Sequence, residues 1–156
     1  GIALTITFAD QVCATVIRPI VERPRPSNPA SPIADLVHIV NGRRGGGFGF
    51  PSCHASNSFV LAFFLVFLFP KRWLSIFICT WAAVNCYTRI YLGLHYPGDL
   101  VVGMLVGLCG AMLMYYLLTR VTKEDFRKAC QTEVIIYTGL LTVAGILIYS
   151  TIQVMQ

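Results

Sequence analysis

The sequence predicts an all-α protein, a polytopic transmembrane helical bundle of about five membrane helices with one short interfacial helix. Of its 156 residues, 56% are hydrophobic and only 12% are charged, whereas soluble domains average about 25% charged residues. The chain also contains apolar runs close to the roughly 20 residues that a helix needs to cross a hydrocarbon layer of about 30 Å. Most of the basic residues lie in the connections between these runs.

Five apolar segments are candidate membrane helices, and their bounds are Ile2 to Ile17, Ala55 to Phe69, Trp73 to Leu94, Leu100 to Leu118 and Val134 to Val154. The first two are short, so either their polar flanks lie near the interface or the first helix continues upstream. The chain also opens at Gly1 in mid-pattern, with no charged leader ahead of an apolar core. We therefore expect one membrane-embedded domain over residues 1–156 that lacks its N-terminal helices.

The connections have distinct compositions. Repeated prolines prevent a regular helix from Arg23 to Pro32 and predict a stiff surface loop. Ile33 to Val40 is predicted to form the short interfacial helix. The glycines of residues 41–50 indicate a mobile loop, or alternatively a close backbone approach that shapes the entrance to a site. Gly103 and Gly107 form a small-xxx-small pattern, which favours close helix packing.

The net charge of +5 raises the question of a nucleic-acid partner, but no basic face interleaved with aromatic residues is present. The composition favours a lipid bilayer and an anionic lipid or phosphate as partners, and argues against nucleic acid. The six cysteines show no CxxC spacing, so neither a disulfide framework nor a zinc site is predicted. The sequence makes no prediction of the oligomeric state.

The stretch TRIYLGLHYPGD, Thr88 to Asp99, brings Arg89, His95 and Asp99 together between two apolar segments. Ionisable side chains at membrane depth are rare and indicate a functional site by default. His95 and Asp99 are four residues apart, so the carboxylate can reach one imidazole nitrogen, hold the tautomer and leave the other nitrogen free. The alternative is a pair that merely satisfies itself at a helix junction.

Counting membrane crossings places the candidate site residues on one face, and they are Arg18, Arg25, Ser52, His54, Arg89, His95 and Asp99. Lys and Arg divide evenly between the two faces until Arg18, Arg25 and Arg89 are set aside as site residues. The opposite face then carries the excess of positive charge and is cytoplasmic by the positive-inside rule. The site is expected to face the periplasm or extracytoplasmic space.

This set of residue types is a suitable cage for a phosphoryl group. Guanidinium forks match phosphate oxygens in pairs, and a helix that begins after Ser52 adds unpaired N–H groups and a positive dipole end. His95, oriented by Asp99, is expected to be the nucleophile. His54 is expected to protonate the leaving alkoxide, a contribution of about 10² to 10⁴ in rate. No metal or other cofactor is predicted, because Asp99 is the only acid in the constellation.

Three stretches carry a resemblance to a known family: RPIVERPRP (Arg18 to Pro26), PSCH (Pro51 to His54) and TRIYLGLHYPGD (Thr88 to Asp99). In order and spacing they resemble the three signature motifs of the type-2 phosphatidic acid phosphatase superfamily. The resemblance implies a six-helix membrane core, metal-independent hydrolysis of lipid phosphates or pyrophosphates, and a phosphohistidine intermediate at His95.

The resemblance also implies roles for single residues. Arg18, Arg25 and Arg89 look like the phosphate ligands, joined by Ser52 and the backbone N–H of Cys53. His54 looks like the acid, and Asp99 like the partner of the nucleophile. The chain departs from the usual motifs at three positions, where Arg18 replaces lysine, Cys53 replaces glycine and Thr88 replaces serine.

Other basic residues on the same face are interpreted without a role in the site. His38, alone in an amphipathic stretch, is more typical of an interfacial residue than of a site. Arg23, Arg43 and Arg44 are interpreted as solvated loop charges or as contacts to anionic headgroups.

Two other classes remain to be weighed. Vanadate-dependent haloperoxidases share the three motifs but resemble soluble helical bundles, which the hydropathy disfavours. A non-catalytic lipid-phosphate binding or transport module would keep the anion cage without turnover, and this alternative stays open. The candidate substrates include undecaprenyl pyrophosphate, phosphatidylglycerol phosphate, phosphatidate and the phosphates of lipid A. The expected location is a bacterial inner (plasma) membrane.

Overall fold

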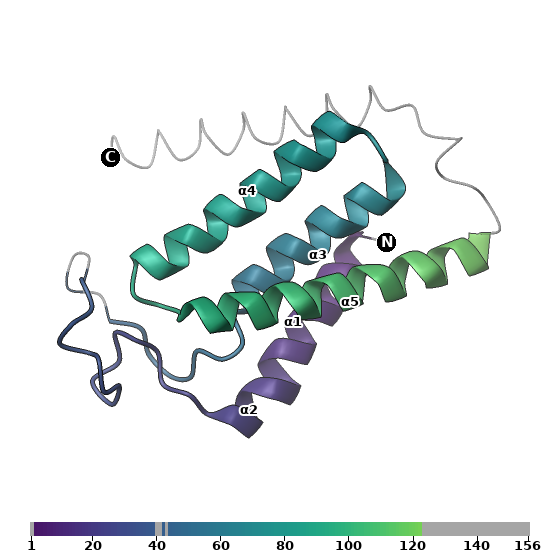
Figure 1. Cartoon of the computed structure of the whole chain (residues 1–156). Coiled ribbons are helices and arrows are strands. Elements are labelled where there is room, and N and C mark those ends of the chain that lie inside the picture. Colours follow the sequence, from purple (N-terminus) through teal and green to yellow (C-terminus); the bar gives the residue numbers. More distant parts are fainter. Residues whose placement is uncertain (1, 40–41, 43, 123–156) are drawn as a thin grey trace, which may run out of the picture. The chain divides into compact units, whose positions relative to one another are not determined.

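The computed structural model of the chain describes residues 2–39, 42 and 44–122, which belong to the unit formed by residues 1–124. Its elements are α1 (Ile2–Gln11), the π-helical turn η1 (Val12–Ile17), α2 (Arg18–Val21), α3 (Cys53–Leu68), α4 (Arg72–Tyr91) and α5 (Pro97–Thr122) (Figure 1). These described residues contain no β-strand, so the predicted all-α class is confirmed. The fifth apolar segment, Val134 to Val154, lies outside them, and so does the end of the predicted domain over residues 1–156.

Two of the described helices are long and apolar enough to cross a membrane, Ile2–Val21 and Pro97–Val121, and Cys53–Leu68 is a shorter apolar helix. The first runs beyond its predicted end at Ile17, because α1, η1 and α2 follow one another without a break. Pro19 is tolerated there since it lies in the first turn of α2, directly after a π-helical turn that helps to satisfy the backbone. The helix ends where Glu22 adopts a left-handed conformation with φ of 48°.

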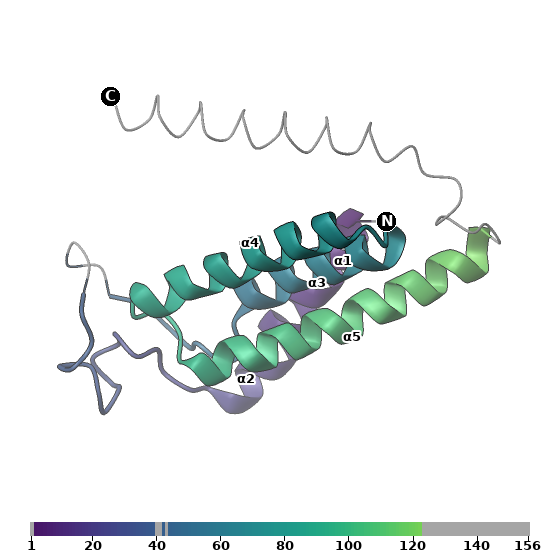
Figure 2. The same cartoon turned by 45° about the horizontal axis from the view of Figure 1, so that its top comes forward.

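The central helix of the described part is α3, which packs against α1, α4 and α5 (Figures 1 and 2). Glycines bring α5 close to it. A Cβ atom at Gly103 would lie 2.6 Å from the carbonyl oxygen of Ser52, and one at Gly107 would lie 2.8 Å from the carbonyl oxygen of Ser56. The predicted packing role of the small-xxx-small pattern is confirmed. The same contact holds the start of α3 beside the start of α5.

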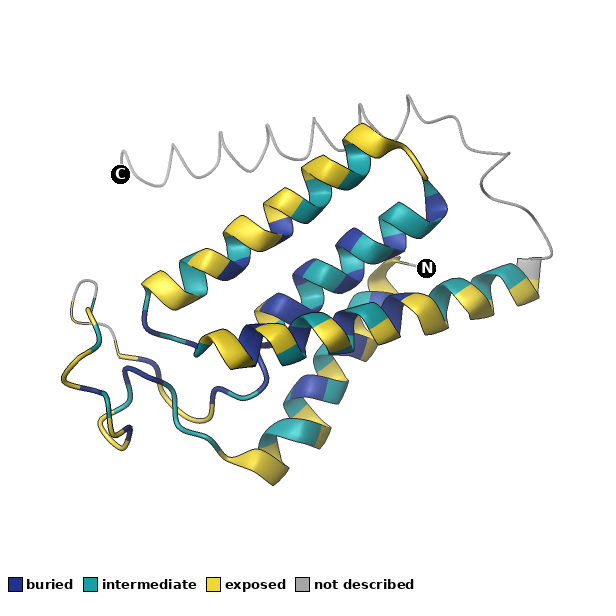
Figure 3. Ribbon diagram, viewed as in Figure 1, coloured by how far each residue is buried: buried dark blue, intermediate teal, exposed yellow. Residues whose placement is uncertain are grey.

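Many residues of α4 are exposed, as the yellow bands along this helix in Figure 3 show, and large apolar residues are among them. Trp73, Ile76, Phe77 and Val84 are each more than half exposed. An exposed apolar surface of this kind is expected where a helix contacts lipid or another apolar surface. Only Ala82 and Cys86 of α4 are buried.

The prediction of an interfacial helix over Ile33 to Val40 is wrong for its described part, where residues 32–36 form turns. Hydrogen bonds span three residues there, from Ala34 N–H to Ser31 and from Leu36 N–H to Ile33, rather than the four of an α-helix. Prolines precede this stretch closely and leave too few donors to nucleate a regular helix.

The same loop is anchored over the junction of α4 and α5. Ser27 N–H donates to the carbonyl of Gly93 at 3.0 Å, and the Ser27 hydroxyl accepts from Gly45 N–H at 2.9 Å. A Cβ atom at Gly45 would meet Cδ of Arg25 at 2.6 Å. Close backbone approach, the alternative interpretation of this glycine-rich stretch, therefore describes Gly45, which packs against Arg25.

Candidate active site

Five parts of the fold bring the candidate residues to one region. Arg18 begins α2, Arg25 lies in the following loop, Ser52 to His54 begin α3, Arg89 lies in the last turn of α4, and His95 and Asp99 flank the start of α5. The charges of Arg18, Arg25 and His54 act on His95, while those of Arg18, Arg25 and Arg89 act on His54. The two histidines, which are 41 positions apart in the chain, therefore share one electrostatic environment.

The start of α3 is well defined. Ser52 is fully buried and caps the helix, its hydroxyl accepting from Ala55 N–H at 3.3 Å. Its own N–H donates to the carbonyl of Asp99 at 3.1 Å, which ties the starts of α3 and α5 together. Cys53 adopts a helical conformation, so its substitution for glycine introduces no left-handed backbone.

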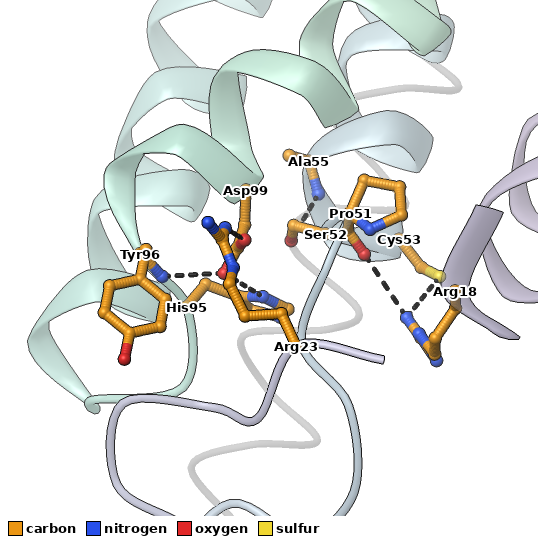
Figure 4. A network of polar contacts seen from close by, with 9 residues as sticks. All are labelled: Arg18, Arg23, Pro51, Ser52, Cys53, Ala55, His95, Tyr96 and Asp99. Atoms are coloured by element: carbon orange, nitrogen blue, oxygen red, sulfur yellow. Dashed lines mark hydrogen bonds and ion pairs between the residues drawn. The ribbon is translucent and has the colours of Figure 1, made fainter. Parts of the chain in front are cut away.

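Arg18 reaches the start of α3 with one nitrogen of its guanidinium. Nη2 donates to Sγ of Cys53 at 2.8 Å and to the carbonyl of Pro51 at 3.4 Å (Figure 4). Nε of Arg18 is buried with no hydrogen-bond partner among the described residues. The Arg18 side chain is thus held beside the start of α3, while its Nε–H group remains without a hydrogen-bond acceptor among the described residues.

Asp99 is fully buried in the first turn of α5. Its Oδ2 accepts from the N–H of Tyr96 at 2.8 Å and lies 3.5 Å from Nδ1 of His95, which is itself 3% exposed. Figure 4 shows the imidazole lying beside the carboxylate. The spacing of four residues thus does bring the two side chains together, but at a distance longer than a hydrogen bond, and Nδ1 of His95 has no hydrogen-bond partner among the described residues.

Sequence reasoning missed Arg23. Its guanidinium pairs with Oδ1 of Asp99 and lies over the rings of Phe50 and Tyr96, at 4.8 and 4.9 Å from their centroids. A signal was present, because alternate residues of an extended chain point to the same side and Arg23 is two positions from Arg25. The prolines on either side favour that extended backbone.

The cluster is short of negative charge. The buried Nε atoms of Arg25 and Arg89 have no hydrogen-bond partner among the described residues, and Asp99 is already paired with Arg23. Burial, with a contribution from the charge of Arg18, lowers the pKa of Arg25. Burial and the charge of Arg25 lower the pKa of His95 to about 3, although a hydrogen bond to the backbone of Gly49 acts in the opposite direction. The arrangement can therefore accept an anion beside a neutral imidazole.

Two other basic residues lie outside this cluster. His38 is exposed, and its ring centroid lies 6.4 Å from that of Tyr91. Arg44 is exposed and donates to the carbonyl of Ser27 at 3.3 Å, which stabilises the loop. Arg43 lies outside the described residues.

Partly buried arginines, two histidines and a helix start at one site of a helical membrane protein are the arrangement expected of a lipid phosphatase. The chain is a member of the PAP2 superfamily, whose model matches residues 1–123. It is 63% identical to the lipid A 4'-phosphatase of Bacteroides thetaiotaomicron over 98% of this chain and 72% of that protein. It is also 35% identical to the lipid A 4'-phosphatase of Porphyromonas gingivalis, over 74% of this chain and 48% of that protein.

A more distant relative is the sphingosine-1-phosphate phosphatase 1 of Rattus norvegicus, 26% identical over 81% of this chain and 29% of that protein. No solved structure is significantly similar to the chain. The relatives share one type of reaction, removal of phosphate from a lipid, so the expected superfamily and enzyme class are both confirmed.

Proposed function

We propose that this lipid phosphatase hydrolyses the 4'-phosphate of lipid A through a phosphohistidine on His95, without a metal ion. The observation that carries the proposal is the buried His95 beside Asp99, in a cluster of arginines whose buried Nε atoms have no hydrogen-bond partner among the described residues. The names of the two bacterial relatives support the choice of substrate.

The first half of the reaction forms the intermediate. The low pKa keeps His95 neutral near pH 7. Once the substrate displaces the backbone contact with Gly49, the second ring nitrogen can attack phosphorus, forming an N–P bond while the P–O bond to the lipid breaks. His54 protonates the departing oxygen. Arg18, Arg25 and Arg89 balance the charge of the phosphoryl oxygens, and the buried carboxylate of Asp99 stabilises the positive imidazole.

The second half releases phosphate. His54, now neutral, takes a proton from water, which attacks phosphorus as the N–P bond breaks. His95 returns to its neutral form and inorganic phosphate leaves. Ser52 and the backbone N–H of Cys53 lie at the helix start, where unpaired N–H groups favour the anion in both steps.

We place the site on the periplasmic side of a bacterial inner membrane, because the predicted opposite face carries the excess of Lys and Arg outside the site. The loop residue Gly46 and the α3–α4 connection residue Lys71 test this orientation, since both are exposed. In intact cells, with native cysteines replaced, an impermeant maleimide should label Gly46→Cys and spare Lys71→Cys. The reverse pattern would invert the orientation.

The experiment that tests the activity is phosphate release from purified lipid A with an excess of chelator. The wild-type protein should release phosphate and form a radiolabelled phosphohistidine after acid-free quenching, and His95→Ala should do neither. Strict dependence on magnesium would contradict the histidine mechanism. Tight binding of the lipid by the wild-type protein with no release would favour the non-catalytic binding or transport alternative.

A further inference from the structure

A cavity of about 290 Å³ lies beside His54, with walls from α1, α3 and α4. It is at the lower end of the roughly 300 to 1,000 Å³ typical of small-molecule pockets. Its lining surface is mainly apolar, and the polar or aromatic residues that contribute to it are Asp10, His54, Asn57, Ser58, Trp81 and Asn85. His54, Asn57, Ser58 and Leu61 are spaced as one stripe of a helix, so the cavity follows α3 away from its start.

The polar groups of this cavity occupy apolar helices, where buried polar atoms need partners. Asn57 donates to Oδ1 of Asp10 at 2.9 Å, and Asn85 donates to the hydroxyl of Ser58 at 2.6 Å. The Oδ1 atom of Asn57 is buried and accepts no hydrogen bond from the described residues. An acceptor of this kind costs about 1 to 3 kcal/mol when unsatisfied, so a ligand donor that draws the amide oxygen of Asn57 into the cavity would stabilise it.

The position of His54 indicates which part of the substrate enters here. In the reaction proposed above, His54 protonates the leaving oxygen, so the leaving group must contact this imidazole. Asn57 lies one turn further along α3, a rise of about 4.5 Å, which is close to the width of one sugar ring. The phosphate stays with the arginines, and the alcohol that it leaves occupies the cavity.

We propose that this cavity is a subsite for a sugar ring that bears the phosphate, an inference that rests on the proposed function. A sugar carries hydroxyl or amide N–H groups that can donate to Asn57 and Asp10, and its C–H face can pack on the indole of Trp81. A diacylglycerol with its ester groups offers no donor beyond the leaving hydroxyl, and an isoprenoid chain offers none. The subsite therefore selects phosphorylated glycolipids over the other lipid phosphates.

Substrate selectivity of purified variants tests the subsite. Asn57→Ala and Asn85→Ala should each lower kcat/KM for lipid A by about 5- to 30-fold, the effect of about one lost hydrogen bond, and change it less than about twofold for phosphatidate. Val84→Ala is the matched control, since Val84 adjoins Asn85 on α4 but is 57% exposed and outside the cavity. Equal losses on both substrates, or no loss on lipid A, would overturn the proposal.

A binding measurement separates the subsite from the reaction. The chain has two tryptophans, so a Trp73→Phe protein reports on Trp81 alone. Dephosphorylated lipid A should change the emission of Trp81, diacylglycerol should not, and Asn57→Ala should weaken the response at least fivefold. Failure of phosphate release from every lipid would refute the proposed function, whereas equal responses to both ligands would refute the subsite even in an active enzyme.

Discussion

Replacing Asp99 by asparagine tests how the buried carboxylate acts on His95. The carboxylate serves three neighbours with two oxygens: Arg23 at Oδ1, and Tyr96 N–H and His95 at Oδ2. An amide of the same shape has only one oxygen. If its nitrogen faces Arg23, two donors oppose each other, and if it faces His95 it donates to Nδ1 and stabilises the unproductive tautomer.

The distances indicate the size of the effect. In serine hydrolases the corresponding change lowers turnover by about 10⁴. Here the Nδ1 to Oδ2 distance is 3.5 Å, so the ground-state contact is weaker, and we expect kcat to fall by about 10² to 10³. The phosphate ligands are untouched, so KM for lipid A should change by less than about threefold.

Steady-state phosphate release, with the rate of phosphohistidine formation in a single turnover, measures both quantities. Asp35→Asn is the matched control, because Asp35 is an exposed acid in the loop ahead of α3 and should leave both constants unchanged. A variant that raises KM at constant kcat would refute the assigned role of Asp99 and indicate that it supports binding alone.

Four further predictions rest on single contacts of the site and of the helix packing. Arg23→Gln leaves the buried Asp99 without its guanidinium partner and should lower the free energy of unfolding by about 1 to 3 kcal/mol, measured by denaturation in detergent. The loss is smaller than for a fully buried pair because the Arg23 side chain is 38% exposed. Arg23→Lys should recover part of it. Gly103→Ala should destabilise the packing of α5 against α3 by about 1 to 3 kcal/mol. Gly98→Ala in the same helix, where an added Cβ would meet nothing within 4 Å, should leave stability unchanged. Equal effects of the two substitutions would contradict the packing argument. His95 has a pKa of about 3 in the folded protein and about 6.5 in the unfolded chain, so the unfolded chain binds more protons between these pH values. The contribution of His95 to stability is therefore lost as the pH falls from about 6.5 towards 3. Arg25→Gln removes the second cause of that low pKa and should move the acid limb of kcat/KM to higher pH, while an unchanged limb would assign it to another group.

Much of the site was predictable because its determinants are local. The cap at Ser52 depends on a serine directly before an apolar helical run, and the pairing of His95 with Asp99 depends on a spacing of four residues across a turn. Counting membrane crossings then predicts which connections lie on the same face, and this count requires only that the helices exist. Capping and spacing are properties of neighbouring residues, and parity needs only the number of apolar segments, so all three can be recognised without coordinates.

The local rules also explain the errors. The interfacial helix predicted from Ile33 failed because composition alone gave too little weight to the prolines before it. The first helix passed Arg18 and Pro19 because a π-helical turn accommodated the proline, an adjustment that no residue pattern announces.

The sequence by itself determined the helical class, the approximate extent of the described helices and the set of candidate residues that the fold brings to one region. Only the tertiary structure decided which of several similar arginines meets Asp99, and that Asn57 and Asn85 line a cavity beside His54. The physical reason is that partners far apart in the chain are chosen by the path of a loop and the fit of packed helices. The count of crossings predicts six arginines on one face, and their charges alone are equivalent.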